Sequence, residues 1–228
     1  LYLSEGGLSL KPFDKSKHGD IKVDFLRGKN NHRRVYSKSY RSDIARAFAI
    51  SSKNKPRILD CTAGFGSDAF YLASLGCEVK LIERNPLIYA LLYDGIQRMQ
   101  MAICSDEQLK KCINISCRYG DSICYLNQSS GDQRFFDAIY LDPMFPPKSK
   151  SAKSKKEMQA VQNITDSEDD YDKLLSGALE SRVKRIVIKR PIKGSFLSGI
   201  SPSFSIKARS IRSVSYTHIR AHETVLHL

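Results

Sequence analysis

The sequence predicts an α/β domain with a mostly parallel central sheet, and three observations support this fold class. The chain has 228 residues, 41% of them hydrophobic, which is enough to bury one large core. Between residues 57 and 189, short apolar runs typical of strands alternate with longer helical patterns. A glycine-bearing turn follows the first of these strands, where a strand would pass into a helix.

The first 55 residues predict a small β-rich appendage with one short helix. Apolar and polar residues alternate at residues 8–10 and 21–25, which indicates two short strands. Ser42 is a suitable N-cap for a short helix that continues to Ala49. Residues 53–56 then break the chain, so we expect the main domain to span residues 56–212.

The hydrophobic pattern of the main domain predicts alternating strands and helices. The expected strands are residues 57–61, 78–82, 113–119, 136–141 and 185–189, and the expected helices are 68–74, 86–101 and 171–180. Residues 148–170 are polar and highly charged, which favours a mobile loop containing a short helix.

The charge of the chain favours an anionic partner. The formal net charge is +13, and the excess lies at two flanks. Residues 1–56 carry 13 basic and 5 acidic side chains, and residues 182–212 carry 9 and none. Two basic flanks around a mildly acidic centre suit a phosphate backbone, although a solvated basic surface is the simpler alternative.

The cysteines and the hydropathy indicate a cytoplasmic protein without a membrane span or a metal. Six cysteines include no C-x-x-C pair, so they fit neither a zinc site nor a disulfide framework. No apolar run approaches the roughly 20 residues of a spanning helix. The chain begins at Leu1 without a secretion signal, and we expect a fragment or a trimmed chain.

Two motifs predict a nucleotide-like cofactor at the carboxyl ends of strands. Residues 60–68 run from Asp60 through Gly64 and Gly66, and these glycines let the backbone approach a ligand. The next strand ends at Glu83, whose carboxylate would accept hydrogen bonds from the ribose hydroxyls of an adenosine. This pattern suits NAD and S-adenosylmethionine (SAM) equally.

A third motif, Asp-Pro-Met-Phe-Pro-Pro at residues 142–147, favours SAM. It resembles the (Asp/Asn)-Pro-Pro-(Tyr/Phe) signature of methyltransferases that act on exocyclic amino groups of bases. Such an amine has its lone pair delocalised into the ring, so it needs hydrogen-bond acceptors that restore its nucleophilicity. Asp142 and the carbonyl fixed by Pro143 would be these acceptors, and Phe145 would stack on the base. The alternative is a common Asp-Pro turn without chemistry.

Together these strings resemble the ribosomal RNA small subunit methyltransferase J family from about residue 8 to residue 212. Further matching strings are Val23-Asp24-Phe25, His32-Arg33-Arg34, Leu75-Gly76-Cys77 and Val187-Ile188-Lys189-Arg190-Pro191. The resemblance implies a Rossmann-like fold, SAM as the methyl donor, and transfer to the exocyclic N2 of a guanine in 16S ribosomal RNA. The substrate would be free RNA or an assembled small subunit.

The resemblance also implies the residues that contact the methyl donor. They are Ser67, Asp68, Glu83, Arg84, Asp121, Ser122 and Asp142, in addition to Asp60, Gly64 and Gly66 of the glycine turn. The family commonly has Arg at the position of Ser67 and Ser at that of Asp121.

Basic side chains in three segments are expected to contact RNA phosphates: His32, Arg33, Arg34, Lys148, Lys150, Lys155, Lys156, Lys189 and Arg190. A solvated loop is the alternative for residues 148–156. Two other functions stay open. One is a methyltransferase acting on amino groups of DNA or protein, and the other is an inactive module that binds RNA or assists assembly.

After Arg212 the sequence departs from the family pattern, which continues with a closing strand. Residues 213–228 show no sustained hydrophobic period, so we expect a foreign segment that is dispensable and lies outside the sheet. Three of the five histidines lie here, but without a ligand spacing, so no metal site is expected.

Overall fold

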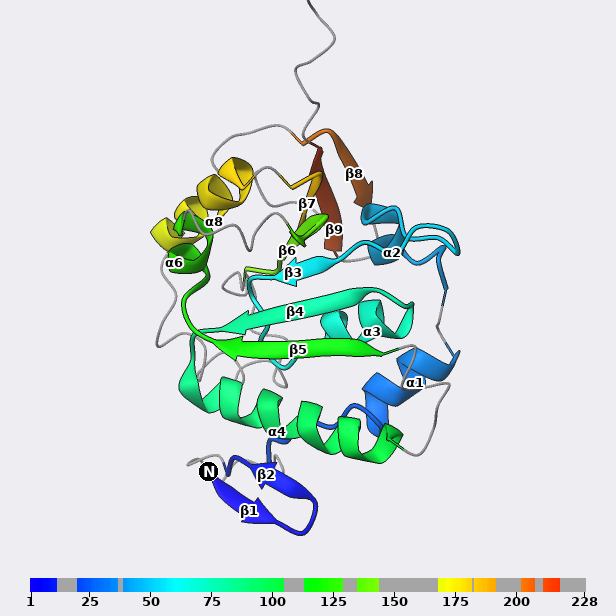
Figure 1. Ribbon diagram of the computed structural model, residues 1–228, viewed down its shortest axis with the longest axis vertical. Coiled ribbons are helices and arrows are strands. Elements are labelled where there is room, and N and C mark those ends of the chain that lie inside the picture. Colours follow the sequence, from blue (N-terminus) through cyan, green and yellow to red (C-terminus); the bar gives the residue numbers. More distant parts are fainter. Residues whose placement is uncertain are drawn as a thin grey trace, which may run out of the picture.

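The computed structural model describes residues 1–11, 20–36, 39–104, 113–128, 135–143, 168–181, 183–191, 202–207 and 211–217. Within these ranges, a seven-stranded sheet of order β5-β4-β3-β6-β7-β9-β8 forms the centre (Figure 1). The strands are β3 (Ile58–Asp60), β4 (Glu78–Glu83), β5 (Asn114–Tyr119), β6 (Ala138–Leu141), β7 (Arg185–Pro191), β8 (Phe204–Lys207) and β9 (Ile211–Thr217). The pairs from β5 to β7 are parallel, and β9 pairs antiparallel with β7 and β8. The predicted α/β fold with a mostly parallel sheet is confirmed.

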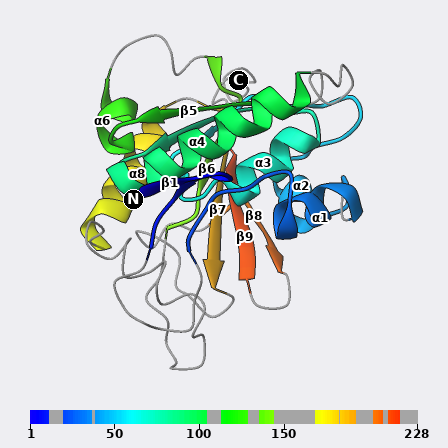
Figure 2. The same ribbon diagram turned by 90° about the horizontal axis from the view of Figure 1, so that it is seen from below.

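Helices cover both faces of this sheet. They are α1 (Gly28–Tyr36), α2 (Asp43–Ala47), α3 (Ser67–Ser74), α4 (Pro86–Ile103), α6 (Ser122–Asn127) and α8 (Glu168–Glu180). Residues of α2, α3 and α4 share one hydrophobic core, whereas α6 and α8 share a second. Figures 1 and 2 show α6 and α8 together at one side of the sheet.

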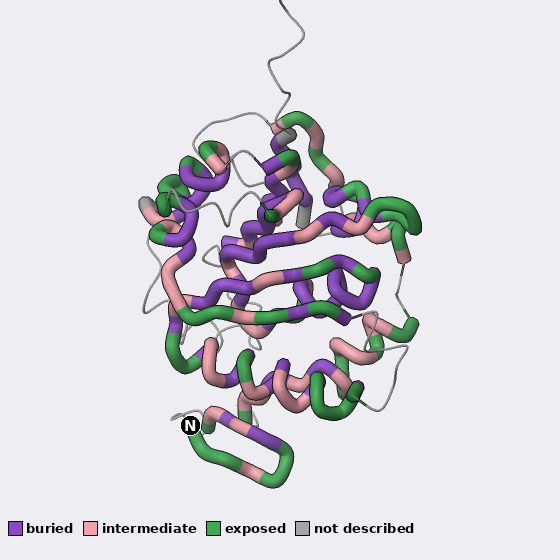
Figure 3. Tube along the Cα trace, viewed as in Figure 1, coloured by how far each residue is buried: buried purple, intermediate pink, exposed green. Residues whose placement is uncertain are grey.

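Neighbouring residues of the central strands pack alternately into the two cores. Ile58 packs in the first core and its neighbour Leu59 in the second, because successive side chains of a strand point to opposite faces. Leu81 and Ile82 divide in the same way. Figure 3 shows the resulting concentration of buried residues along the central strands.

Capping residues set where several helices begin. The Ser42 side chain accepts a hydrogen bond from the backbone N–H of Ala45, which confirms the predicted N-cap of α2. Asn85 caps α4 in the same way, with Pro86 in the first turn, and Asp121 caps α6. The caps of α4 and α6 follow the ends of β4 and β5 after one intervening residue, so each helix starts beside the carboxyl end of a strand.

The N-terminal segment forms a hairpin of β1 (Tyr2–Ser4) and β2 (Gly7–Ser9) that packs on α4 (Figure 1). The Asp94 carboxylate of α4 accepts a hydrogen bond of 3.0 Å from the Leu8 backbone N–H. A strand was expected at residues 21–25, and this was wrong: Ile21 forms one bridge with Leu10. The segment instead buries Val23 and Phe25 in the first core, which accounts for its alternating pattern.

The expectation that residues 213–228 lie outside the sheet was wrong for Ser213–Thr217, which belong to β9. This strand pairs with β7 from Ile211 to Thr217, and its residues Val214 and Tyr216 are buried in the second core. The string Ser-Val-Ser-Tyr alternates polar and apolar residues, which is the pattern of a strand. The alternation covers only four residues, so the sequence alone did not reveal the strand. Residues 218–228 lie outside the described ranges, as does most of the loop expected at 148–170.

No helix in the described ranges is long and apolar enough to cross a membrane. Within the same ranges, no three His, Cys, Asp or Glu side chains gather as a metal would require.

Truncation of the chain tests the role of β9. A chain ending at Arg212 should be less stable than one ending at Thr217, because it loses the buried Val214 and Tyr216 and the pairing with β7 and β8. At about 1.5–3 kcal/mol for each buried side chain, the difference is about 3–6 kcal/mol. Urea denaturation of the two truncated chains measures it, and equal midpoints would show that β9 contributes nothing.

Candidate active site

A pocket opens where β3, β4, β5 and β6 end, at the point where the strand order reverses. The chain passes from β3 outward to β4 and β5, and then returns to the other side of β3 as β6. Crevices at such switch points are the usual ligand sites of open α/β sheets. The lining residues come from five segments: Cys61, Thr62, Gly64, Ile82, Glu83, Arg84, Asn85, Ile88, Asp121, Ser122, Ile123, Asp142, Pro143, Asp170, Tyr171 and Leu174.

Glu83, the last residue of β4, has a fixed carboxylate in this pocket. Its Oε2 accepts a hydrogen bond of 2.8 Å from the Gly64 N–H, and its Oε1 accepts one of 2.8 Å from the Asn85 N–H. The residue is 8% exposed. The two backbone bonds hold the orientation of this carboxylate, which has about four acceptor positions in all.

The glycine turn between β3 and α3 requires left-handed backbone at two positions. Gly64 has a φ of 53° and Gly66 a φ of 70°, a region that other residues avoid. A Cβ at Gly66 would also lie 2.8 Å from a methyl carbon of Leu92. The turn is therefore tight, and the Gly64 N–H joins it to Glu83 on the neighbouring strand.

Thr62 connects the ends of β3 and β6. The Asp60 carboxylate accepts a hydrogen bond of 3.0 Å from the Thr62 N–H, and Thr62 Oγ1 accepts one of 2.6 Å from the Asp142 N–H. Burial, helped by the nearby carboxylates of Asp142 and Asp68, raises the pKa of Asp60 to about 8. Asp60 is thus a buried residue that holds Thr62, which lines the pocket.

The side of the pocket formed by β5 and α6 contains a second group of polar contacts. Asp121 Oδ1 accepts hydrogen bonds from two backbone N–H groups of α6. The Ser122 hydroxyl donates to the Cys61 carbonyl at 2.8 Å. Arg84 Nη1 lies 3.8 Å from Asp121 Oδ2 and 3.1 Å from Asp170 Oδ2, so it joins α6 to α8 across the pocket.

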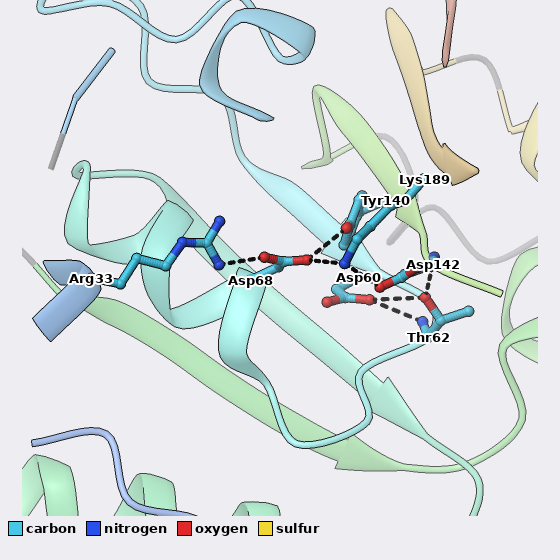
Figure 4. Close-up of polar contacts among 7 residues, drawn as sticks. All are labelled: Arg33, Asp60, Thr62, Asp68, Tyr140, Asp142 and Lys189. Atoms are coloured by element: carbon cyan, nitrogen blue, oxygen red, sulfur yellow. Dashed lines mark hydrogen bonds and ion pairs between the residues drawn. The ribbon is translucent and has the colours of Figure 1, made fainter. Parts of the chain in front are cut away.

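A row of alternating charges lies beside the pocket (Figure 4). Lys189 Nζ is 2.7 Å from Asp142 Oδ2 and 2.9 Å from Asp68 Oδ2. Asp68 also accepts from Arg33 Nη1 at 2.5 Å and from the Tyr140 hydroxyl at 2.9 Å. Although burial would raise it, Lys189 and Arg33 hold the pKa of the Asp68 carboxyl well below its ordinary value.

The structure gathers most of the predicted cofactor residues around one pocket. Those that line it are Gly64, Glu83, Arg84, Asp121, Ser122 and Asp142, together with Pro143, which was predicted as a catalytic residue. Asp60 and Gly66 are buried and do not line it, Ser67 is exposed at the start of α3, and Asp68 belongs to the charge row. Phe145 lies outside the described residues.

The predicted RNA contacts divide into several environments. His32, Arg33 and Arg34 all lie on α1, but Arg33 is bound to Asp68. Arg190 is only 5% exposed within β7, so we leave it out of the proposed RNA surface. Lys148, Lys150, Lys155 and Lys156 lie outside the described ranges.

Several residues of the site were not predicted from the sequence. Asp170 and Tyr171 line the pocket from α8, whereas the polar, charged composition of residues 148–170 predicts a loop that includes Asp170. Their approach depends on the packing of α8 against α6, which no local pattern reveals. Asn85 also lines the pocket, and its position as a cap after the acidic strand end was a usable signal.

The pocket suits the binding of an adenosine-containing methyl donor. Glu83 presents a fixed carboxylate, the glycine turn lets backbone approach a ligand, and Asn85 and Asp121 lie at two helix starts. Ile82, Ile88 and Ile123 supply apolar surface for the base. The residues present therefore fit SAM.

Replacement of Glu83 by Gln should weaken SAM binding by about tenfold to a hundredfold, because one charge-assisted acceptor contributes about 1.5–3 kcal/mol. Calorimetric titration with SAM measures the effect. Glu78 is the matched control, since it is an exposed carboxylate at the other end of β4. Unchanged affinity in Glu83→Gln would remove Glu83 from the donor site.

Comparisons with known proteins agree with this arrangement. A family model described as "Putative SAM-dependent methyltransferase" matches residues 1–218, a range that includes β9. A protein from Cellvibrio japonicus named ribosomal RNA small subunit methyltransferase J is 41% identical over 95% of this chain and 82% of its own length. A protein of the same name from Pseudoalteromonas translucida is 42% identical over 93% of this chain and 82% of its own.

A solved structure supports the fold. The crystal structure of a SAM-dependent methyltransferase from Neisseria gonorrhoeae superposes with a TM-score of 0.70 and 28% identity, covering 96% of this chain and 83% of that one. These matches confirm the resemblance expected from the motifs. The chain belongs to the family of SAM-dependent methyltransferases that includes these relatives, and SAM is its methyl donor.

Proposed function

We propose that this enzyme methylates the exocyclic N2 of a guanine in small-subunit (16S) ribosomal RNA. The observation that carries the proposal is the position of Asp142 and Pro143, which line the same pocket as Glu83. An acceptor for an amino group thus lies beside the residues suited to the methyl donor. The names of the curated relatives support RNA of the small ribosomal subunit as the substrate.

Asp142 is the residue proposed to act on the amine. Bound SAM supplies a methyl group that its sulfonium makes electrophilic. Asp142 would accept a hydrogen bond from the N2 amino group, which draws the amine out of conjugation with the ring and raises the nucleophilicity of the nitrogen. The carbonyl next to Pro143 would be the second acceptor, and Phe145 would stack on the guanine. The rest of catalysis is alignment, which the fixed ends of β3, β4 and β6 provide.

The proposed RNA surface includes helix α1, which packs on α3 close to the charge row. Lys29, His32 and Arg34 supply basic groups on this helix. Tyr36 is 76% exposed, and its ring centroid lies 4.7 Å from that of His32, so the pair offers an aromatic surface for an unpaired base. Lys148, Lys150, Lys155 and Lys156 follow the Asp-Pro turn in sequence and are proposed to contact phosphates as well.

Labelled SAM and ribosomal RNA test the proposal directly. The protein is incubated with unmodified small subunits, with free 16S RNA, with DNA and with ribosomal proteins, and the products are digested to nucleosides or amino acids. Label in N2-methylguanosine is expected, and the two RNA arms identify the true substrate. Label elsewhere would indicate another amino-group methyltransferase, and no label despite SAM binding would indicate an inactive RNA-binding module. A ribosomal substrate also implies a cytoplasmic enzyme.

Replacement of Asp142 by Ala should lower the rate of methyl transfer by about a hundredfold or more, because it removes a preorganised acceptor. The rate is measured with saturating SAM and RNA. Asp43→Ala is the control, since Asp43 is a carboxylate on α2 that is 43% exposed and does not line the pocket. Near wild-type turnover in Asp142→Ala would show that the Asp-Pro turn is not catalytic.

Replacement of Arg34 by Gln should weaken binding of cognate and unrelated RNA alike. If Arg34 contacts one phosphate, the slope of log affinity against log salt falls by about 0.7–0.9. Filter binding across a salt series measures the slope. Arg46→Gln on α2, where Arg46 is 58% exposed, removes the same charge from a different surface. The same slope in Arg34→Gln and wild type would place Arg34 outside the interface.

A further inference from the structure

Lys189 on β7 lies between two carboxylates that are far apart in sequence. Its Nζ is 2.7 Å from Asp142 Oδ2 and 2.9 Å from Asp68 Oδ2, and the Lys189 side chain is 26% exposed. Burial lowers the pKa of a lysine, but Asp142 and Asp68 raise that of Lys189 above its ordinary value. Lys189 therefore stays charged throughout the working pH range.

Asp68 is a fixed anchor for this lysine. Its side chain is 16% exposed, and it holds Arg33 on one oxygen and both Tyr140 and Lys189 on the other. Tyr140 is a fully buried residue of β6, and the Arg33 guanidinium also lies 4.1 Å from the ring centroid of Tyr71. Contacts from α1, β6 and β7 thus converge on one carboxylate of α3 (Figure 4).

Two contacts with described residues hold Asp142 in place. Thr62 Oγ1 accepts from its backbone N–H at 2.6 Å, and Lys189 donates to its carboxylate at 2.7 Å. The first contact fixes where the residue leaves β6, and the second fixes the direction of the side chain. A carboxylate has about four acceptor positions, and the contact with Lys189 occupies one of those of Asp142.

We propose that Lys189 is a positioning residue that orients the Asp142 carboxylate toward the substrate amine and keeps it ionised. The inference rests on the proposed function, and it gives Lys189 a role different from the RNA contact expected from sequence. Because Lys189 is bound to the fixed Asp68, its contact with Asp142 restricts the movement of the Asp142 carboxylate. A misplacement of about 1 Å in such a group can lower a rate by about a hundredfold.

The charge of Lys189 matters because the Asp60 carboxylate interacts here with those of Asp142, Asp68 and, from β4, Glu83. Asp142 is faced by Asp60 from β3, Asp68 from α3, Tyr140 from β6 and Lys189 from β7, with Arg33 of α1 on the far side of Asp68. Neighbouring negative charges raise a carboxyl pKa, and an adjacent cation lowers it. Without Lys189, Asp142 would take up a proton at higher pH and lose its acceptor function there.

Replacement of Lys189 by Met tests the inference. The expected result is a decrease in kcat of roughly tenfold to a hundredfold, with the KM values for SAM and RNA and the salt slope of RNA binding nearly unchanged. The acidic limb of the kcat–pH profile should move to higher pH. Lys184→Met is the matched control, because Lys184 precedes the same strand, is 81% exposed and pairs with Asp137. This control should have wild-type kcat and an unshifted profile.

A second variant and a second measurement keep the test decisive. Lys189→Arg keeps the charge, so it should retain the wild-type acidic limb while its different donor geometry lowers kcat less than Met does. The pKa of Asp142, followed by NMR of carboxyl-labelled protein, should rise in Lys189→Met and not in Lys184→Met. This titration needs no RNA substrate, and Asp142→Asn assigns the signal.

Two outcomes would overturn the role proposed for Lys189, and a third would overturn the proposed function. Loss of RNA affinity and salt slope in Lys189→Met with kcat retained would make Lys189 an RNA contact and overturn the inference. Unchanged kcat together with an unchanged Asp142 titration would overturn it as well. A wild-type protein that methylates no ribosomal RNA would overturn the proposed function, and the NMR titration would then decide the Lys189–Asp142 coupling alone.

Discussion

The parallel pairing of β3 with both β4 and β6 is the constraint on which the pocket depends. Asp60 pairs in register with Leu81 on one side and Tyr140 on the other. This register places Glu83, Thr62 and Asp142 at one edge of the sheet, although 80 residues separate Thr62 from Asp142. The glycine turn lies at this edge as well, because it connects the end of β3 to the start of α3.

The second constraint on the pocket is electrostatic, because several carboxylates lie close together at the carboxyl ends of the strands. The structure offsets them in different ways. Glu83 accepts backbone N–H bonds, Asp68 is paired with Arg33 and Lys189, and Asp60 is buried with a raised pKa. The first arrangement suits the holding of a ligand, the second anchors a cation, and the third supports the turn. Chemically similar carboxylates thus acquire distinct properties from their surroundings.

Much of the central fold and the pocket was predictable from sequence, because the signals were local. The strands were short apolar runs, and Glu83 and Asp142 follow such runs directly, so their place at the carboxyl edge followed from the fold class. The pairing of Lys189 with Asp142 was not predictable, since it depends on the register of β6 with β7. Asp170 was missed for a similar reason, because only the docking of α8 brings it to Arg84. Val23 and Phe25 show the opposite failure, an alternating pattern that packs into the core without forming a strand.

The position of β9 has a consequence for how the protein folds during synthesis. β9 follows β8 in the chain but lies between β7 and β8, and within the described strands β8 pairs only with β9. On the ribosome, β7 therefore keeps an open edge and β8 lacks its partner until residues 211–217 have emerged. Because domains form as their segments become available, the strand that carries Lys189 is flanked on both sides only late in translation. A nascent chain that stalls before this point would contain the glycine turn and Glu83, but the sheet that forms the pocket would be incomplete.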